Sequence, residues 1–451
     1  MELSPLTAVS PVDGRYRKAS EPLGDYFSEF ALIRYRVQVE IAYLIALSKT
    51  GLASLKPFTP SQCEQLLTVI EHFGIEDARR VKEIERMTNH DVKAVEYFLR
   101  EKLELLGLSA WTPWIHFGLT SQDINNTALP LSLRDACAGI YLPQLDEIIC
   151  TLDHMAHEWR TIPMLARTHG QPASPTTLGK EIRVFVERLI AQVHLLKQVP
   201  FSAKFGGATG NFNAHVAAFP NVDWPKFADH FIQDLGLIRT RVTTQIEPYD
   251  NLAAFCDGIK RINTILIDLA RDIWSYISMN YFHQKIQPNE VGSSTMPHKV
   301  NPIDFENAEG NLGIANAILE HLSAKLPISR LQRDLTDSTV TRNIGVPMAH
   351  TLIALSSLKR GLGKLIVHRE AIEADLRNHW VVVTEGIQTI LRREGVTDAY
   401  EKLKAWSRTH EVVTEESVRS FIHSLNIPES VQAELLALTP FSYIGIEGIE
   451  R

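Results

Sequence analysis

The chain has few cysteines, and no two of them lie close together in the sequence. Its four cysteines, Cys63, Cys137, Cys150 and Cys256, contain no Cys-x-x-Cys motif. This spacing indicates neither a disulfide framework nor a cysteine metal site. The 17 histidines are scattered and include no His-Glu-x-x-His motif, which argues against a metal hydrolase. We therefore expect neither a metal ion nor a cofactor.

An excess of positive charge and a long hydrophobic run are also missing. The formal net charge is −7, with 46 Lys and Arg against 53 Asp and Glu, which argues against a general binder of nucleic acid or anionic membranes. No apolar run reaches membrane-spanning length, and the first residues lack the basic and apolar regions of a secretory signal. These absences predict a cytoplasmic protein without nucleic-acid or membrane partners.

What the sequence does contain is apolar residues at helical spacing over long stretches. Such patterns cover residues 23–52, 131–160, 177–199, 251–281 and 305–325, and a further one ends near 367. Long helices pack together as bundles, and no convincing alternating strand pattern is present. We expect an all-α fold of three helical domains, with boundaries at 1–111, 112–367 and 368–451, the second being a central long-helix bundle with a catalytic loop.

Five polar clusters interrupt the apolar patterns. They are Thr88–Asp91, Thr120–Asn126, Thr168–Gln171, Ser293–Asn301 and Arg330–Arg342. A polar patch of this kind is explained either by an exposed face or by a site. The first cluster is expected inside a helical pattern that continues to Leu99. Because the ends of long helices in a bundle can meet around one cleft, clusters distant in sequence can converge on a single site.

The stretch from Pro288 to Pro302 has the composition of an active-site loop. Gly292 frees the backbone, and Pro297 together with Pro302 prevents one regular helix. Consecutive backbone N–H groups near Gly292, followed by Lys299, suit a negatively charged substrate or intermediate. On composition alone, an ordinary polar connection between two helices is an equally good interpretation.

The segment Gly292–Pro302, Gly-Ser-Ser-Thr-Met-Pro-His-Lys-Val-Asn-Pro, resembles the signature of the fumarase/aspartase superfamily. Thr120-Ser121 and Thr168-His169 resemble its other two blocks. Within the superfamily the chain resembles the bacterial adenylosuccinate lyases, on the strength of His298 and the blocks Thr88–Glu96 and Asp13–Tyr16. This resemblance covers essentially the whole chain. It implies elimination of fumarate from adenylosuccinate, giving AMP, and from succinyl-carboxamide imidazole ribotide (SAICAR), giving AICAR, in purine nucleotide biosynthesis.

By this resemblance four residues carry the catalysis. Ser293 is the base that removes a carbon-bound proton, and the loop N–H groups with Lys299 stabilise its alkoxide. His169 is the general acid that protonates the departing nitrogen, and His90 assists. Judged without the resemblance, His169 is more simply a turn histidine bonded in the core.

The resemblance also assigns the substrate contacts. Residues beside His90, namely Asn89 and Asp91, belong to the site. The succinyl carboxylates are held by Thr120, Ser121, Ser294, Lys299 and Asn301. Gln245 contacts the ligand near the scissile bond, and Asn307 lies close after the loop. The nucleotide phosphate is held by Arg15, Tyr16, Arg333, Ser338 and Arg342, although a basic stretch such as 330–342 is otherwise most often a solvated face.

Members of the superfamily are homotetramers whose active sites take residues from three chains, so the resemblance implies that assembly. Two other functions stay open. One is another fumarate-releasing lyase, of the argininosuccinate lyase type, which shares the mechanism and differs in the pocket for the leaving group. The other is a non-catalytic helical scaffold, against which the joint presence of Ser293, Lys299 and His169 argues.

Overall fold

The computed structural model describes residues 4–285, 296, 299–408 and 412–446. The chain divides into two compact units, which are described separately. The first unit comprises Met1–Leu145, Gln192–Leu266 and Ala308–Ser356, and the second comprises Asp146–Ala191, Ile267–Asn307 and Ser357–Arg451. This division does not test the three predicted domain boundaries, which stay a prediction.

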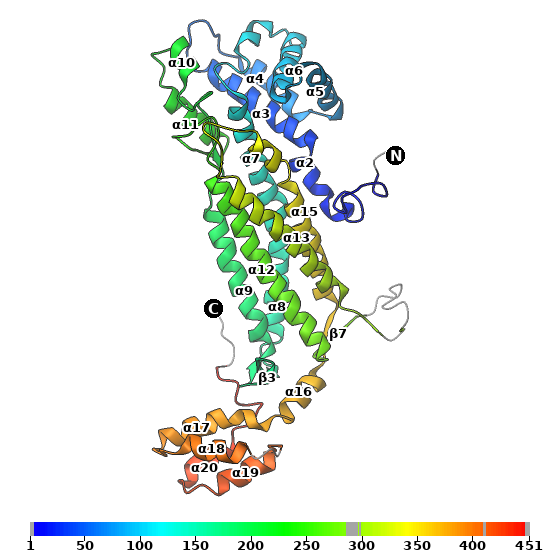
Figure 1. Cartoon of the computed structure of the whole chain (residues 1–451), viewed down its shortest axis with the longest axis vertical. Helices are drawn as coiled ribbons and strands as arrows, with labels where there is room; N and C mark the ends of the chain where they lie inside the picture. Colours follow the sequence, from blue (N-terminus) through cyan, green and yellow to red (C-terminus); the bar gives the residue numbers. More distant parts are fainter. Residues whose placement is uncertain (1–3, 286–295, 297–298, 409–411, 447–451) are drawn as a thin grey trace. The chain divides into compact units, whose positions relative to one another are not determined.

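The first unit opens with six helices. They are α1 (Arg17–Ser20), α2 (Gly24–Phe27), α3 (Glu29–Ser48), α4 (Pro60–Glu71), α5 (Ile75–Thr88) and α6 (Asp91–Leu105). Thr59 caps α4, because its hydroxyl accepts the N–H of Gln62 and the Gln62 side chain accepts the N–H of Thr59. Figure 1 shows α3, α5 and α6 together, and buried apolar side chains such as Val37, Val81 and Phe98 form the core between these helices.

The polar cluster Thr88–Asp91 is a break between two helices. Helix α5 ends at Thr88, Asn89 has a φ of 52°, and α6 begins at Asp91. Asparagine tolerates this left-handed conformation better than most residues, so it can end a helix. The prediction that the cluster lies inside a continuous helical pattern was therefore wrong.

The predicted long helices are confirmed. They are α7 (Ser121–Ala136), a π-helical turn (Cys137–Tyr141), α8 (Leu142–Glu158), α9 (Leu178–Gln198), α12 (Asp250–Ser278), α13 (Ile303–Lys325) and α15 (Gly345–Lys364). The helical region expected from residue 131 begins at Ser121, because Thr120 provides an N-cap with Asp123 in the first turn. The second polar cluster thus occupies the start of α7.

Smaller elements complete the first unit. They are a 3₁₀ turn (Ser109–Trp114), β5 (Ser202–Ala203), α10 (Asn213–Ala218), α11 (Trp224–Asp234), β6 (Ile238–Arg239) and α14 (Thr336–Thr341). Strand β5 pairs in parallel with β6. A second apolar core contains Tyr43 of α3, Ile124 of α7 and Trp224 of α11. This core supports the segment that leads into α7.

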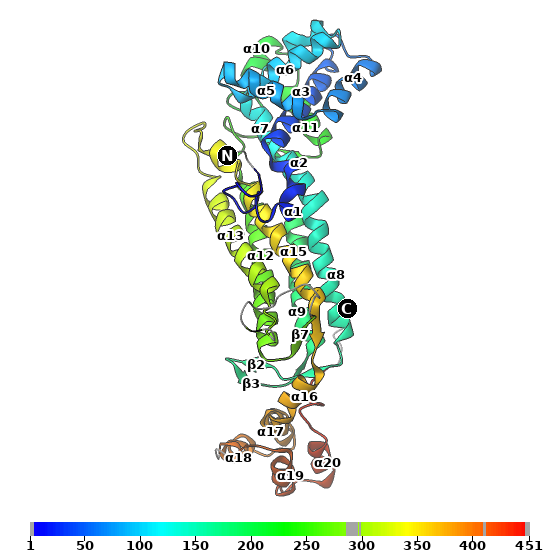
Figure 2. The same cartoon turned by 90° about the vertical axis from the view of Figure 1, so that its right-hand side faces the viewer.

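The second unit contains short strands and the C-terminal helices. The strands are β1 (Pro163–Met164), β2 (Arg167–Thr168), β3 (Gln171–Pro172), β4 (Thr176–Thr177), β7 (Phe282–Gln284) and β8 (Leu365–Val367). The helices are α16 (Arg369–Arg377), a 3₁₀ turn (Trp380–Val383), α17 (Thr384–Arg393), α18 (Ala399–Ser407), α19 (Glu415–His423) and α20 (Glu429–Leu436). Figure 2 shows α17 to α20 gathered together, around buried side chains such as Ile387, Leu403 and Ile422.

The strands of the second unit form two-stranded pairs. Strand β1 pairs with β4, β2 with β3, and β7 with β8, all antiparallel. The sequence showed no convincing strand because each of these strands has only two or three residues, too few for an alternating pattern. In the part of the chain that is described, no helix has the length and apolar character needed to cross a membrane.

Candidate active site

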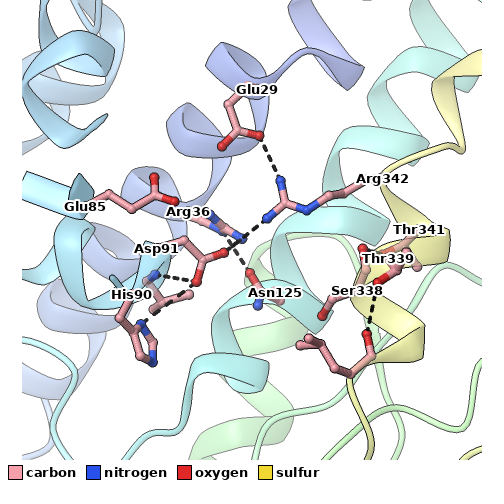
Figure 3. Close-up of polar contacts among 12 residues, drawn as sticks. Glu29, Arg36, Glu85, His90, Asp91, Asn125, Ser338, Thr339, Thr341 and Arg342 are labelled. Atoms are coloured by element: carbon pink, nitrogen blue, oxygen red, sulfur yellow. Dashed lines mark hydrogen bonds and ion pairs between the residues drawn. The ribbon is translucent and has the colours of Figure 1, made fainter. Parts of the chain in front are cut away.

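Asp91 is the centre of a charged cluster in the first unit, drawn in Figure 3. Its Oδ2 accepts from Arg36 Nη2 at 2.7 Å and from Arg342 Nη2 at 3.3 Å. Arg36 also donates from Nε to Asn125 Oδ1 at 2.8 Å, and Arg342 donates from Nη1 to Glu29 Oε2 at 2.9 Å. Helices α3 and α6 and the end of α14 therefore meet at the Asp91 carboxylate, and α7 joins them through the bond between Arg36 and Asn125.

The Asp91 carboxyl is held in its charged form. Burial raises its pKa, but Arg36, the N–H of Val92 and Arg342 lower it by more, so the pKa lies below the usual value. The Val92 N–H donates to Oδ1 at 2.9 Å. An aspartate in the first turn of α6 is also favoured by the positive end of the helix dipole.

His90 is the N-cap of α6. Its Nδ1 accepts the backbone N–H of Lys93 at 3.1 Å. A neutral histidine that accepts through Nδ1 carries its proton on Nε2. The cap therefore orients the neutral ring so that Nε2 is available as a donor.

A second group of polar side chains lies around α14. Arg333 Nη2 donates to Ser338 Oγ at 2.9 Å. The amide oxygen of Gln122 faces Arg333 Nε at 3.0 Å, the orientation required because a guanidinium can only donate. Ser338 and Arg342 are four residues apart at α14 and so share one face of it.

Members of both groups line one pocket of the first unit, whereas Arg333 lies outside its lining. Its lining residues are Leu32, Arg36, Asp91, Gln122, Asn125, Asn126, Leu129, Tyr249, Ser338, Thr341 and Arg342. Guanidinium and hydroxyl groups are the donors that a phosphate or carboxylate requires. In the described ranges no three His, Cys, Asp or Glu side chains are placed to hold a metal ion. The pocket is suited to a small anion.

A buried ion pair holds the start of α7 in place. Lys204 Nζ lies 2.7 Å from Asp123 Oδ1, and both side chains are 0% exposed. Asp123 also accepts the N–H of Gly206 at 2.8 Å and, through Oδ2, the N–H of Thr120 at 2.8 Å. Thr120 and Ser121 are therefore held at a helix N-terminus, where backbone N–H groups and the helix dipole favour an anion.

His215 packs against the Gly-rich segment 205–213, with 5.6 Å between its ring centroid and that of Phe212. The Tyr43 hydroxyl donates its proton to the Phe117 carbonyl at 2.7 Å and lies 3.1 Å from His215 Nε2. The hydroxyl must therefore accept from Nε2, while Nδ1 is buried without a hydrogen-bond partner. Burial lowers the pKa of His215 to about 4, with Asp123 raising it and Lys204 lowering it by smaller amounts. The ring is neutral near pH 7.

His215 makes a pH-dependent contribution to stability. Its pKa falls from an ordinary 6.5 to about 4 on folding, so the unfolded chain binds the extra proton between these values. The contribution is complete above about pH 6.5 and is lost as the pH falls towards about 4. We expect the thermal midpoint of His215→Gln to fall less than that of the wild type between about pH 7.5 and pH 5. Equal falls in both proteins, measured by circular dichroism, would contradict this.

Three other predicted site residues belong to the first unit but lie outside the pocket lining. The Arg15 guanidinium carbon lies 6.0 Å from the Tyr16 ring centroid, and Arg15 is exposed. Gln245 donates from Nε2 to the Ala208 carbonyl at 3.2 Å. Gln245 therefore contacts the Gly-rich segment that also bonds Asp123.

The remaining predicted residues belong to the second unit or to undescribed parts of the chain. His169 is exposed on the turn between β2 and β3 and has a φ of 54°. Lys299 is exposed, and its backbone N–H donates to the Met296 carbonyl at 3.0 Å. Asn301 is half-buried, and Asn307 in α13 accepts from Ser357 Oγ at 2.8 Å. Ser293, Ser294 and His298 lie outside the described residues.

Sequence reasoning missed Arg36, Asn125, Glu29 and Gln122. Arg36 lies within an apolar helical pattern, and only its burial at 3% exposure reveals that its charge must be paired inside the protein. The available signal was a charged residue within this apolar pattern, and α3 buries two of them, Arg36 and Glu40. Asn125 and Gln122 fall inside the polar cluster at the start of α7, which had been singled out as a whole.

Comparison with known proteins gives matches over nearly the whole chain. A family model described as "Lyase" matches residues 14–317, and one described as "Adenylosuccinate lyase C-terminal" matches residues 329–444. Adenylosuccinate lyase of Dictyostelium discoideum is 56% identical over 458 residues, covering 99% of this chain and 98% of that protein. Adenylosuccinate lyases of Haemophilus influenzae and Escherichia coli K12 are each 49% identical, covering 100% and 99% of this chain and 100% and 98% of those proteins.

Solved structures agree on the fold. A fumarate lyase from Mesorhizobium sp. BNC1 matches with a TM-score of 0.75 at 19% identity, covering 94% of this chain and 95% of that one. The 3-carboxy-cis,cis-muconate lactonizing enzyme from Pseudomonas putida matches with a TM-score of 0.74 at 20% identity, covering 94% of both chains. These two structures show an all-α fold of the fumarase/aspartase type. With relatives of such high identity over its full length, the chain belongs to the adenylosuccinate lyase family.

Proposed function

We propose that the chain is a carbon–nitrogen lyase that eliminates fumarate from adenylosuccinate to give AMP, and from SAICAR to give AICAR, in purine nucleotide biosynthesis. The observation that carries this proposal is the full-length similarity to adenylosuccinate lyases at up to 56% identity. The pocket of the first unit supports it, because Arg342, Ser338 and Arg36 offer donors to an anionic substrate. The enzyme acts in the cytoplasm as a homotetramer with active sites shared between chains.

The reaction requires three groups in defined roles. A base removes the proton from the carbon next to a carboxylate, and the electron pair forms the double bond as the carbon–nitrogen bond breaks. Ser293 is the proposed base, with Lys299 stabilising the charge that builds up on the substrate carboxylate. His169 gives its proton to the departing nitrogen, and His90 assists. The products are fumarate and the amine that has received this proton, and the reaction requires no cofactor.

The other predicted residues bind the substrate. Asn89 and Asp91 place His90, since one ends α5 and the other starts α6. The succinyl carboxylates are held by Thr120, Ser121, Ser294, Lys299 and Asn301, and Gln245 and Asn307 lie near the reacting part. The phosphate is held by Arg15, Tyr16, Arg333, Ser338 and Arg342.

Release of fumarate, followed by ultraviolet absorbance, tests the function. The purified protein is offered adenylosuccinate, SAICAR, argininosuccinate, aspartate and malate, with Ser293→Ala as the control. We expect turnover of the first two substrates only, and none by the folded variant. Preferential turnover of argininosuccinate would make the chain another fumarate-releasing lyase, and no turnover of any substrate would favour a non-catalytic scaffold.

The phosphate assignment predicts a selective effect of Arg342→Gln. An arginine–phosphate hydrogen bond contributes about 1.5–3 kcal/mol, so we expect KM for adenylosuccinate to rise roughly 10- to 150-fold with little change in kcat. The matched control is Arg330→Gln in the same stretch, where the 79% exposed side chain pairs with Asp334. Equal KM values for the two variants in steady-state assays would remove Arg342 from the phosphate site.

A further inference from the structure

The turn that presents His169 is a short and strained hairpin. Strands β2 and β3 have two residues each, with Thr168 opposite Gln171. The two turn residues, His169 and Gly170, have φ angles of 54° and 75°, as in the tight two-residue turns that join antiparallel strands. A left-handed conformation is uncommon for a residue other than glycine. Because so short a ladder is not stable alone, other contacts must hold the turn.

Arg167 supplies the main contact. Its Nη2 donates to both oxygens of Asp375, at 3.0 and 2.7 Å, and its Nη1 reaches the Gly170 carbonyl at 3.5 Å. One guanidinium therefore links a carboxylate of α16 to the turn itself. Asp375 is only 16% exposed and Arg167 29%, so water screens the pair less than it screens most surface pairs.

Asp375 gathers further partners from the same unit. The Tyr281 hydroxyl donates to its Oδ2, and His379 Nδ1, which is hydrogen-bonded to the backbone carbonyl of Asp375 at 2.7 Å, lies 3.1 Å from Oδ1. Tyr281 directly precedes β7, and the predicted catalytic loop follows this strand in the sequence. Burial raises the pKa of Tyr281, and its bond to Asp375 raises it further, so the phenol stays a donor. The carboxylate thus has donors on more than one side.

The apolar packing under the hairpin points to the same helix. Leu165, between β1 and β2, is buried with Leu376 and Val382. Leu376 is the neighbour of Asp375 in α16, so one segment supplies both the apolar and the polar support. After β3 in the sequence, Ser174 Oγ donates to Glu385 of α17. Figure 2 shows β2 and β3 next to α16.

We propose that Asp375 is a positioning residue for catalysis: through Arg167 it fixes the turn that aims His169 at the departing nitrogen. This inference rests on the proposed function, in which His169 is the proton donor. Proton transfer requires close approach of donor and acceptor, and a displacement of about 1 Å costs on the order of 100-fold in rate. A carboxylate that never touches the substrate thereby controls the chemical step.

The experiment compares Asp375→Asn with Glu373→Gln. Asparagine keeps the size of the side chain but offers Arg167 one oxygen and an opposing NH₂ group. Glu373 lies on the same helix and pairs with Arg377 at 3.0 Å, away from the hairpin. We expect Asp375→Asn to lower kcat roughly 10- to 100-fold with little change in KM, and Glu373→Gln to leave both unchanged. Hydrogen exchange of residues 166–173 is expected to quicken in the first variant only.

The double variant Asp375→Asn/His169→Asn distinguishes loss of His169 positioning from a general disruption of the structure. In that background the proton donor is gone, so Asp375→Asn is expected to cause no further loss of kcat. A further loss of the same size as in the wild type, unchanged exchange of residues 166–173, or faster exchange with unchanged kcat would each overturn the proposal. If the wild type cleaves no adenylosuccinate while Asp375→Asn still quickens exchange, the proposed function fails and the support of the turn by Asp375 stands.

Discussion

Replacing Lys204 by methionine is expected to lower the free energy of unfolding by about 3–5 kcal/mol, the usual effect of breaking a buried ion pair from one side. Lys204 and Asp123 are both 0% exposed, with 2.7 Å between Nζ and Oδ1. Burial lowers the pKa of Lys204, although Asp123 raises it in part. Removing the ammonium leaves the Asp123 carboxylate buried with backbone N–H groups as its remaining donors.

Urea unfolding followed by circular dichroism measures this loss, and Lys402→Met serves as the control. Lys402→Met breaks an exposed pair with Asp398, whose side chains are 49% and 55% exposed, and should change the free energy of unfolding by less than about 1 kcal/mol. The prediction would be contradicted if Lys204→Met lowered the free energy of unfolding by no more than Lys402→Met does.

The consequence for the site is local. Asp123 bonds Thr120 and the Gly-rich segment at once, so Lys204→Met should also loosen the N-terminus of α7 where the succinyl carboxylates are proposed to bind. In the sequence, Thr120–Asn126 and the Gly-rich segment 205–213 are two separate stretches. Only the fold reveals that Asp123 joins them, because a contact across 83 residues leaves no periodic signal.

Local patterns predicted the helices well because apolar spacing repeats over many residues. Ile259, Ile262 and Leu266 of α12, for example, are all fully buried, as their spacing required. The same patterns failed at Thr88–Asp91, where a single left-handed residue, Asn89, interrupts the helix. A break of that kind depends on one dihedral angle and barely alters the apolar repeat.

The sequence and the resemblance predicted which residues belong to the candidate site, but they did not predict the contacts between these residues. His90 and Asp91 were named from the sequence, but the network of Asp91 with Arg36, Arg342 and Glu29 joins residues as far as 313 positions apart. Likewise, nothing in the sequence linked Arg167 to Asp375, 208 positions away. The tertiary fold brings such charged residues together, because a charge buried inside the protein requires a partner of opposite charge.

The largest effect on turnover is expected from His169→Asn. Loss of a positioned proton donor lowers kcat by roughly 10²- to 10⁴-fold, while KM should change little because the side chain acts on the departing nitrogen. Asparagine is the suitable replacement because His169 has a φ of 54°, a conformation that asparagine adopts more readily than most residues. The turn is thereby kept while the acid is removed.

Steady-state fumarate release from adenylosuccinate, with circular dichroism as a check of folding, measures this effect. The control is His72→Asn at the end of α4. The His72 side chain is exposed, and its Nδ1 lies 3.2 Å from the Thr68 carbonyl oxygen. The kcat of this control variant should match that of the wild type. If His169→Asn kept kcat within about threefold, less than the 10²-fold minimum expected of a general acid, another group would have to protonate the leaving nitrogen. His90 would then be the first residue to test, because its cap to Lys93 leaves Nε2 as the donor.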